Sequence, residues 1–210
     1  MGMPDINQPA HEFWEELYKN ASPDTKGRPS AMLEHYVAKR TPGVALDLGC
    51  AKGDDAVWLA RRGWHVTAVD ISPTALDYAR ANAERNGVAD CIDFQVHDLS
   101  KSFPELACDL VTAMFLHTPL AFPRAQVLQR AAKALRPGGL LLIVGHGSFA
   151  PWQWKVRSQP LAAAKDSLAE LDLPASDWVK LFVGKVDRES IGPEGQKASV
   201  SDTIIALERL

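Results

Sequence analysis

Residues 44–53 carry the pattern that most limits what this chain can fold into. The short apolar run Val44–Leu48 is followed by Gly49 and Gly53, and a stretch with helical periodicity begins directly afterwards at Asp54. Glycine has no Cβ, so the backbone at these two positions can turn with positive φ or approach a ligand closely. The pattern predicts a buried strand, a tight turn and a helix whose first amides face whatever lies over the turn. An ordinary turn in a parallel sheet has the same local pattern.

Strands and helices alternate along the chain after this turn. Apolar runs predict further strands at residues 64–69, 92–96, 110–114 and 140–144. One helix is predicted between Ser72-Pro73 and Asn86-Gly87, which are typical helix start and stop signals, and another over residues 125–135. The alternation predicts an α/β fold with a doubly wound, mainly parallel sheet. Any ligand is expected across the carboxyl ends of the strands.

Two acidic residues stand where predicted strands end. Asp70 follows the second strand, 21 residues after Gly49, where a carboxylate can accept both hydrogens of a ribose diol. Asp98 follows the third strand and can accept from an adenine amino group, with the amide of Leu99 facing a ring nitrogen. Each has a plainer alternative, since Asp70 can cap the helix at Ser72 and Asp98 can hold a turn. Together the two acids indicate a site for an adenosine derivative.

Composition limits the class of protein and its partners. With 210 residues, 46% of them hydrophobic and 23% charged, the chain is predicted to form one domain with a sizeable core. A net charge of -3 offers no basic excess for nucleic acid. Three widely spaced cysteines favour neither disulfides nor a metal site, so we expect no metal and a reducing cytoplasm. The sequence has no apolar core of a signal peptide. It also has no apolar run of the roughly 18 residues that a membrane span requires.

Four segments, taken in order, carry a family resemblance: residues 45–53 (ALDLGCAKG), 66–72 (VTAVDIS), 96–99 (VHDL) and 135–140 (LRPGGL). They resemble the motif series of class I S-adenosylmethionine-dependent methyltransferases. Within that superfamily the chain is similar to the small tellurite-resistance and thiopurine methyltransferase group. The resemblance implies a Rossmann-like sheet of seven strands with an antiparallel last strand. It also implies S-adenosyl-L-methionine as the cofactor and S-adenosyl-L-homocysteine as the product.

The resemblance implies roles for the residues of the first turn. Gly49, Cys50 and Gly53 would bend around the methionyl part of the cofactor, and Asp47 would contact its ammonium group. The family usually has a third glycine where this chain has Ala51, so the alanine methyl group is expected to crowd the cofactor. Asp70 would hold the ribose. The cofactor-binding residues expected in full are Trp14, Tyr18, Arg28, Asp47, Gly49, Cys50, Ala51, Gly53, Asp70, Ile71, Asp98, Leu99 and Met114.

The N-terminal segment is predicted to cover this site. Phe13, Trp14, Leu17 and Tyr18 form one apolar stripe of a short helix, and the loop that follows is rich in turn formers. We therefore expect residues 11–30 to act as a lid, with Arg28 reaching toward the cofactor carboxylate. The predicted organisation is a disordered tail at 1–10 and one domain at 11–210, with a helical cap at 11–40, a cofactor-binding core at 41–147, a substrate-side insertion at 148–176 and final strands at 177–210.

Methyl transfer from a sulfonium is an in-line displacement that depends on alignment and a desolvated pocket. A base is required only if the acceptor arrives protonated, and His117 and His146, which follow the fourth and fifth strands, are the predicted candidates. Each can instead be a polar wall residue. No Asn-Pro-Pro-aromatic sequence follows the fourth strand, which disfavours a nucleic-acid base as the acceptor. A small molecule with a thiol, a chalcogen oxyanion or a hydroxyl is the expected acceptor.

Two other functions are compatible with parts of this pattern. A nicotinamide-dependent oxidoreductase is disfavoured because residues 49–53 lack the Gly-x-Gly-x-x-Gly spacing that seats a pyrophosphate. A non-catalytic sensor or scaffold that binds S-adenosylmethionine is not excluded by any residue pattern. Either a monomer or a homodimer fits the sequence.

Overall fold

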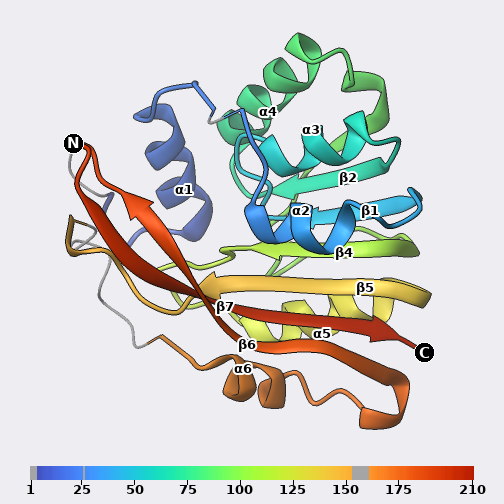
Figure 1. Cartoon of the computed structure of the whole chain (residues 1–210). Helices are drawn as coiled ribbons and strands as arrows, with labels where there is room; N and C mark the ends of the chain where they lie inside the picture. The colour runs from blue at the N-terminus through green and yellow to red at the C-terminus, as the bar shows by residue number, and fades with distance from the viewer. Residues whose placement is uncertain (1–3, 26, 153–160) are drawn as a thin grey trace.

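The strand predicted at residues 44–48 forms and lies inside a seven-stranded sheet of order β3-β2-β1-β4-β5-β7-β6. The computed structural model describes residues 4–25, 27–152 and 161–210 (Figure 1). The strands are β1 (Val44–Leu48), β2 (His65–Asp70), β3 (Ile92–Val96), β4 (Cys108–Met114), β5 (Leu135–His146), β6 (Trp178–Ile191) and β7 (Lys197–Arg209). The α-helices of the described ranges are α1 (Ala10–Lys19), α2 (Ala31–Val37), α3 (Asp54–Arg61), α4 (Pro73–Arg85), α5 (Arg124–Ala134) and α6 (Ala164–Glu170).

The sheet is parallel from β3 through β5, and β7 runs against its neighbours. Ala45 of β1 pairs with Val66 of β2 on one side and with Leu110 of β4 on the other. The last strand, β7, pairs antiparallel with both β5 and β6. The predicted doubly wound, mainly parallel sheet with an antiparallel last strand is confirmed.

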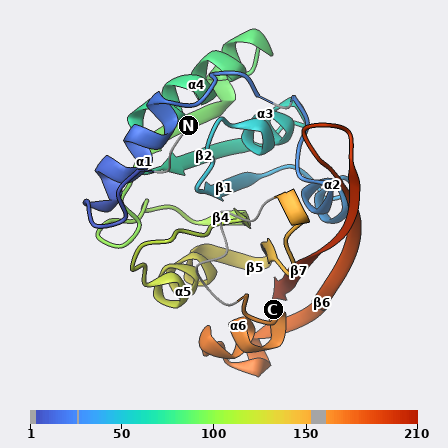
Figure 2. The same cartoon turned by 90° about the vertical axis from the view of Figure 1, so that its left-hand side faces the viewer.

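The winding of the chain reverses between β1 and β4. From β1 the chain moves outward through β2 and β3, and it then returns to β4 and β5 on the other side of β1. Ligands in open α/β sheets bind outside the carboxyl ends of the strands at such a switch point. Figure 2 looks onto this end of the molecule, where α1 lies beside α4. The topology therefore positions a site above β1 and β4.

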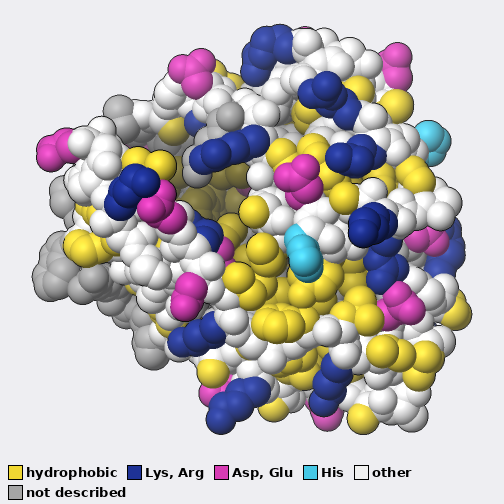
Figure 3. Space-filling view, in the orientation of Figure 1, with side chains coloured by type: hydrophobic (Ala, Val, Ile, Leu, Met, Phe, Trp, Pro, Cys, Tyr) yellow, Lys and Arg dark blue, Asp and Glu magenta, His cyan; other side chains and the backbone are white. Residues whose placement is uncertain are grey.

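Two hydrophobic cores fill the spaces between the sheet and its helices. On one face α2, α3 and α4 bury Leu33, Leu59 and Leu76. On the other face α5 and α6 bury Leu128 and Ala164. The central strands contribute side chains to both cores, which explains why they read as continuous apolar runs. On the α2 face, hydrophobic side chains also gather over the β5, β7 and β6 half of the sheet (Figures 1 and 3).

The start of α4 confirms its prediction, whereas α2 starts without a side-chain cap. The Ser72 hydroxyl accepts a hydrogen bond from the amide of Ala75, and Pro73 occupies the first turn. Ser30 stands at the N-cap position directly before α2, but its side chain makes no capping bond. Its own amide instead donates to Oδ1 of Asp55 at 2.6 Å, so Ser30 ties α2 to α3.

Other segments depart from the predicted boundaries. α1 begins at Ala10, within the stretch that we expected to be a tail, and residues 1–3 lie outside the described part. β5 begins at Leu135, which pairs with Cys108 of β4, and pairing resumes at Leu140 opposite Leu110 after a register shift. The predicted insertion at 148–176 contributes α6 to the core beneath the sheet, and its residues 153–160 lie outside the described part. None of the described helices is long and apolar enough to cross a membrane.

Candidate functional site

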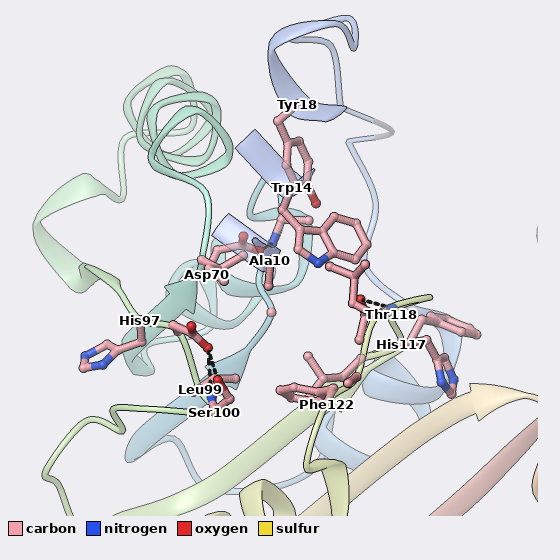
Figure 4. Close-up of a pocket in the computed structure, with 18 of the residues that line it drawn as sticks. Ala10, Trp14, Tyr18, Asp70, His97, Leu99, Ser100, His117, Thr118 and Phe122 are labelled. Carbon is pink, nitrogen blue, oxygen red and sulfur yellow. Dashed lines mark hydrogen bonds between the residues drawn. The ribbon is translucent and has the colours of Figure 1, made fainter. Parts of the chain in front are cut away.

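A cavity of about 310 Å³ lies at the carboxyl ends of β1 to β4, and its size is within the range of ligand pockets. Figure 4 shows Leu99 and Ser100 on one side, His117 and Thr118 on the other, and Trp14 between them. The surface is hollowed beside α1 (Figure 3). The described residues that line the cavity are Ala10, Trp14, Tyr18, Gly49, Ala51, Asp70, Ile71, His97, Asp98, Leu99, Ser100, Met114, Phe115, Leu116, His117, Thr118, Leu120, Ala121 and Phe122.

Asp70, at the end of β2, holds together the two turns that form the floor of the cavity. Its Oδ2 accepts from the amide of Ala51 at 3.0 Å, and its Oδ1 accepts from the amide of Ser72 at 3.0 Å. Burial raises the pKa of Asp70, while these backbone hydrogen bonds act in the opposite direction. The capping alternative for Asp70 therefore holds in part, because this carboxyl binds the start of α4. Asp70 also lines the cavity, where its role toward a ribose stays a prediction.

The turn after β1 brings backbone close to the cavity. Gly49 has φ +69°, and a Cβ there would lie 2.8 Å from the side chain of Leu116. Gly53 has φ +78°, and a Cβ there would lie 2.9 Å from the Cβ of Ala79 on α4. Ala51 also has a positive φ, of 50°, a conformation that glycine adopts more easily. Gly49 thus permits close approach at the cavity, whereas Gly53 permits the packing of α3 against α4.

Asp47 lies beneath this turn and carries an unpaired buried oxygen. The residue is 2% exposed, and its Oδ1 accepts from the hydroxyl of Thr112 at 2.7 Å. Its Oδ2 has no hydrogen-bond partner among the described residues. Burial raises the pKa of Asp47, and the negative charges of Asp55 and Asp70 raise it further, although Thr112 acts against them. A positive charge placed beside Oδ2 would offset the cost of burying the ionised carboxylate.

Asp98 and Leu99 line the cavity at the end of β3. Oδ1 of Asp98 accepts from the amide and the hydroxyl of Ser100, and Oδ2 pairs with the Lys101 ammonium at 2.8 Å. Although partial burial works against it, these contacts lower the pKa of Asp98, which is therefore ionised at neutral pH. The turn role considered for Asp98 is confirmed. His97 beside it is held by Ser102 and Gln95.

The helix α1 covers the cavity with Ala10, Trp14 and Tyr18. Burial, together with the negative charge of Asp70, raises the pKa of Tyr18, so its hydroxyl stays protonated and can donate a hydrogen bond. On the same helix, the carboxylate of Glu15 accepts from the hydroxyl of Ser72. The helix α1 therefore lies over the cavity, as predicted, and it is docked on α4.

Two histidines stack at the β4 and β5 side of the cavity. The rings of His117 and His146 have centroids 5.6 Å apart and planes 23° apart. His117 lines the cavity, whereas His146 lies behind it between the rings of Phe115 and Phe149. Burial lowers the pKa of His117 to about 4, and the positive charge of Arg124 contributes to this shift. Burial also lowers the pKa of His146.

Some of the predicted site residues lie outside the lining of the cavity. Most of the expected cofactor residues line the cavity, but Asp47, Cys50, Gly53 and Arg28 do not. The Cys50 side chain is buried in the core, and its amide donates to the carbonyl of Val69. Arg28 is exposed, because the loop that carries it runs along the surface. Of the two predicted histidines, His146 is separated from the cavity by His117.

Sequence reasoning missed the loop after β4, which forms one wall of the cavity. Leu116, Thr118, Leu120 and Phe122 all line it and were not predicted to do so. The strand-end argument that identified Asp70 applies equally to the end of β4, so position alone could have indicated these residues. Their mostly apolar side chains gave no chemical signal.

Comparisons with known proteins agree with this fold. Residues 45–139 match a family described as a methyltransferase domain. Ribosomal RNA small subunit methyltransferase C from Alcanivorax borkumensis is 32% identical over 130 residues, covering 59% of this chain and 38% of that protein. Ribosomal protein L11 methyltransferase from Dechloromonas aromatica is 41% identical over 104 residues, covering 49% and 32%. Trans-aconitate 2-methyltransferase from Methylobacterium radiotolerans is 32% identical over 132 residues, covering 62% and 48%.

Solved structures share the fold over nearly the whole chain. TehB from Haemophilus influenzae has a TM-score of 0.68 at 17% identity, covering 95% of this chain and 67% of that one. Geranyl diphosphate C-methyltransferase from Streptomyces coelicolor, solved with S-adenosyl-L-homocysteine, has a TM-score of 0.70 at 14% identity, covering 99% and 100%. The chain spans about a third to a half of the length of the curated relatives cited above. Residues 45–139 are thus similar to a methyltransferase domain, and the solved structures share the fold of the chain.

Proposed function

We propose that this protein is an S-adenosyl-L-methionine-dependent methyltransferase that acts on a small-molecule acceptor and releases S-adenosyl-L-homocysteine. The observation that carries the proposal is the cavity above the switch point of the sheet, where Asp70, Asp98 and the glycine turn meet. The finer assignment to the tellurite-resistance and thiopurine group remains part of the proposal.

The residues present fit this cofactor. Asp70 and Asp98 supply acceptors for a ribose diol and an adenine amino group at the ends of neighbouring strands, and Ile71 and Leu99 supply apolar contact for the base. The buried Oδ2 of Asp47, which has no partner among the described residues, suits an ammonium group, reached directly or through water. Each end of the cofactor thus meets groups of complementary chemistry.

When bound, the cofactor supplies a methyl group already activated by its positive sulfur. The protein then has to align the acceptor and to exclude water. Trp14 and Tyr18 cover the cavity from α1, and Leu116 and Phe122 form an apolar wall after β4. These residues are suited to align the acceptor and to keep water away from it.

A small acceptor suits this cavity better than a macromolecule. α1 covers the cavity through Trp14 and Tyr18 and is held on α4, which narrows the approach to the site. The net charge of -3 also gives little attraction for ribosomal RNA. The curated relatives act on ribosomal RNA, on a ribosomal protein and on a small molecule according to their names, so this choice rests on the cavity.

The test is a screen for formation of S-adenosyl-L-homocysteine with thiols, phenols, selenite and tellurite as acceptors, with RNA and total protein as further arms. We expect turnover with at least one small molecule and none with RNA or protein. Tight binding of S-adenosyl-L-homocysteine without turnover on any acceptor would instead support a sensor or scaffold.

A further inference from the structure

We infer that two copies of this chain pair along the outer edge of β6, so that the sheet continues from one copy into the other. β6 (Trp178–Ile191) is the last strand of the sheet, and within the described part of the chain it pairs with β7 alone (Figure 1). The inference concerns a surface of the protein and does not depend on the proposed methyltransferase function. Of the two states that the sequence left open, it selects the homodimer.

The free edge of β6 is long and carries exposed apolar side chains. The strand has 14 residues and contains no proline, and its outer backbone groups have no strand partner among the described residues. An exposed edge of this kind is a template for the addition of another strand. Three large apolar side chains of β6 are exposed: Val179 at 40%, Leu181 at 42% and Ile191 at 65%. A second strand would pair the backbone groups and cover part of this apolar surface.

Two opposite charges near the middle of β6 have no ion-pair partner in the described part of the chain. They are Lys185 and Asp187, which are both exposed. Their side chains stand on the same face of the sheet, because side chains two residues apart in a strand point the same way. By contrast, Glu189 on the same strand already pairs with Lys197 of β7 at 3.0 Å. Lys185 and Asp187 are therefore available to charges on another chain.

A two-fold axis through Val186 gives each of these charges an opposite partner. Two antiparallel strands related by such an axis keep every side chain on its own face of the sheet, and residues equally far from Val186 lie opposite each other. Lys185 of one copy then lies opposite Asp187 of the other copy, and symmetry forms the same pair a second time. At both ends of the paired stretch, Leu181 of one copy comes near Ile191 of the other. The edge of β6 is thus complementary to itself in charge and in apolar surface.

Neighbouring registers of the two strands lack this complementarity. An axis through Lys185 or through Asp187 would place two like charges directly opposite each other. An axis through Arg188 would place Asp187 of each copy opposite Glu189 of the other, and an axis through Gly184 would give no pair of opposite charges. Like charges directly opposite destabilise a strand pair, which is how charges on an edge usually keep other strands away. On β6 the same charges disfavour the shifted registers and favour the one described above.

The stretch that would pair is separate from the cavity. Trp178 and Val183, in the first half of β6, pack against the core that α6 joins, whereas Lys185, Asp187 and Glu189 beyond them are exposed. The described lining of the cavity contains no residue of β6. Pairing through β6 should therefore leave the affinity for S-adenosyl-L-homocysteine unchanged.

The experiment measures the dissociation constant of the dimer by analytical ultracentrifugation of the full chain, with circular dichroism to show that each variant is folded. Asp187→Lys and Lys185→Asp should each weaken the dimer by about tenfold or more, because each places like charges opposite each other twice. The double variant, which exchanges the two charges, should dissociate as the wild type does. Lys180→Glu reverses an exposed charge on the same strand that faces no charge in this register, and it is the matched control.

A second measurement uses the unaltered protein, so the inference stays testable if a variant fails to fold. Unlabelled and heavy-isotope-labelled chains are mixed and treated with a carbodiimide, which joins a lysine amine to a carboxylate without a spacer. A cross-link between Lys185 of one isotope and Asp187 of the other supports the inference. A chain that stays monomeric at its highest soluble concentration overturns it, as does a dimer that is insensitive to both single reversals or whose mixed-isotope cross-links join other residues. Absence of binding to S-adenosyl-L-homocysteine would instead remove the proposed function and leave the dimer as it is.

Discussion

Glu15 and Ser72 lie 57 residues apart in the chain, and a hydrogen bond of 2.6 Å from the Ser72 hydroxyl to Oε2 of Glu15 joins α1 to α4. The same carboxylate accepts from the amide and the hydroxyl of Thr74 at 3.1 and 2.6 Å. The amide of Ser72 in turn donates to Asp70. The helix that covers the cavity and the acid at its floor are therefore connected through one residue.

Replacing Glu15 should loosen the cover. Glu15→Gln removes a charge that lies at the start of α4 and accepts three hydrogen bonds, so we expect a loss of about 1–3 kcal/mol in the free energy of unfolding. Affinity for S-adenosyl-L-homocysteine should fall as well. Glu12→Gln, an exposed glutamate on the same helix, is the matched control. Equal stability of the two variants in urea unfolding would contradict a docking role for Glu15.

Hydrogen exchange should reveal whether this cover opens. Amides of residues 10–19 are expected to gain protection when S-adenosyl-L-homocysteine is added, while those of Val44–Leu48 stay protected throughout. A chain that starts at Ser30 should stay folded and lose turnover. If the shortened chain is fully active, residues 10–29 are not a lid.

Ala51→Gly should stabilise the protein. The added chain entropy of a glycine would by itself lower stability slightly, but Ala51 has a φ of 50°, where an alanine is strained and a glycine is not. We expect a gain of about 0.5–1 kcal/mol in the free energy of unfolding, with cofactor affinity kept or improved. Weaker binding of S-adenosyl-L-homocysteine by the folded variant would mean that the methyl group makes a useful contact.

Cofactor binding should release protons through Asp47. Burial raises the native pKa of Asp47 above its unfolded value, so its contribution to stability is present at acidic pH and is lost as pH rises above the ordinary carboxyl range. An ammonium group beside Oδ2 favours the ionised form and expels the proton. Calorimetry near pH 6, in two buffers of different ionisation enthalpy, should detect proton release in the wild type and less in Asp47→Asn. The same release in both proteins would place the ammonium elsewhere.

The sequence predicted the parts of the fold and site that depend on short stretches of chain. Val44–Leu48 and the start of α4 follow from local apolar runs and capping chemistry, and Asp70 follows from a spacing counted along the chain. The contact of Glu15 with Ser72 could not be predicted in this way, because nothing near either residue indicates the other. The same holds for the placement of His146 behind His117, which depends on how β4 and β5 pair.

The clearest test of the central claim is a calorimetric titration of the full chain with S-adenosyl-L-homocysteine, set beside NAD and repeated with Asp70→Asn. Asparagine keeps one oxygen acceptor for the amides of Ala51 and Ser72 but removes the charge. We predict saturable binding of S-adenosyl-L-homocysteine, none of NAD, and a weakening of about 1.5–3 kcal/mol in the folded variant. Binding of NAD in place of S-adenosyl-L-homocysteine, or unchanged affinity in Asp70→Asn, would contradict the account.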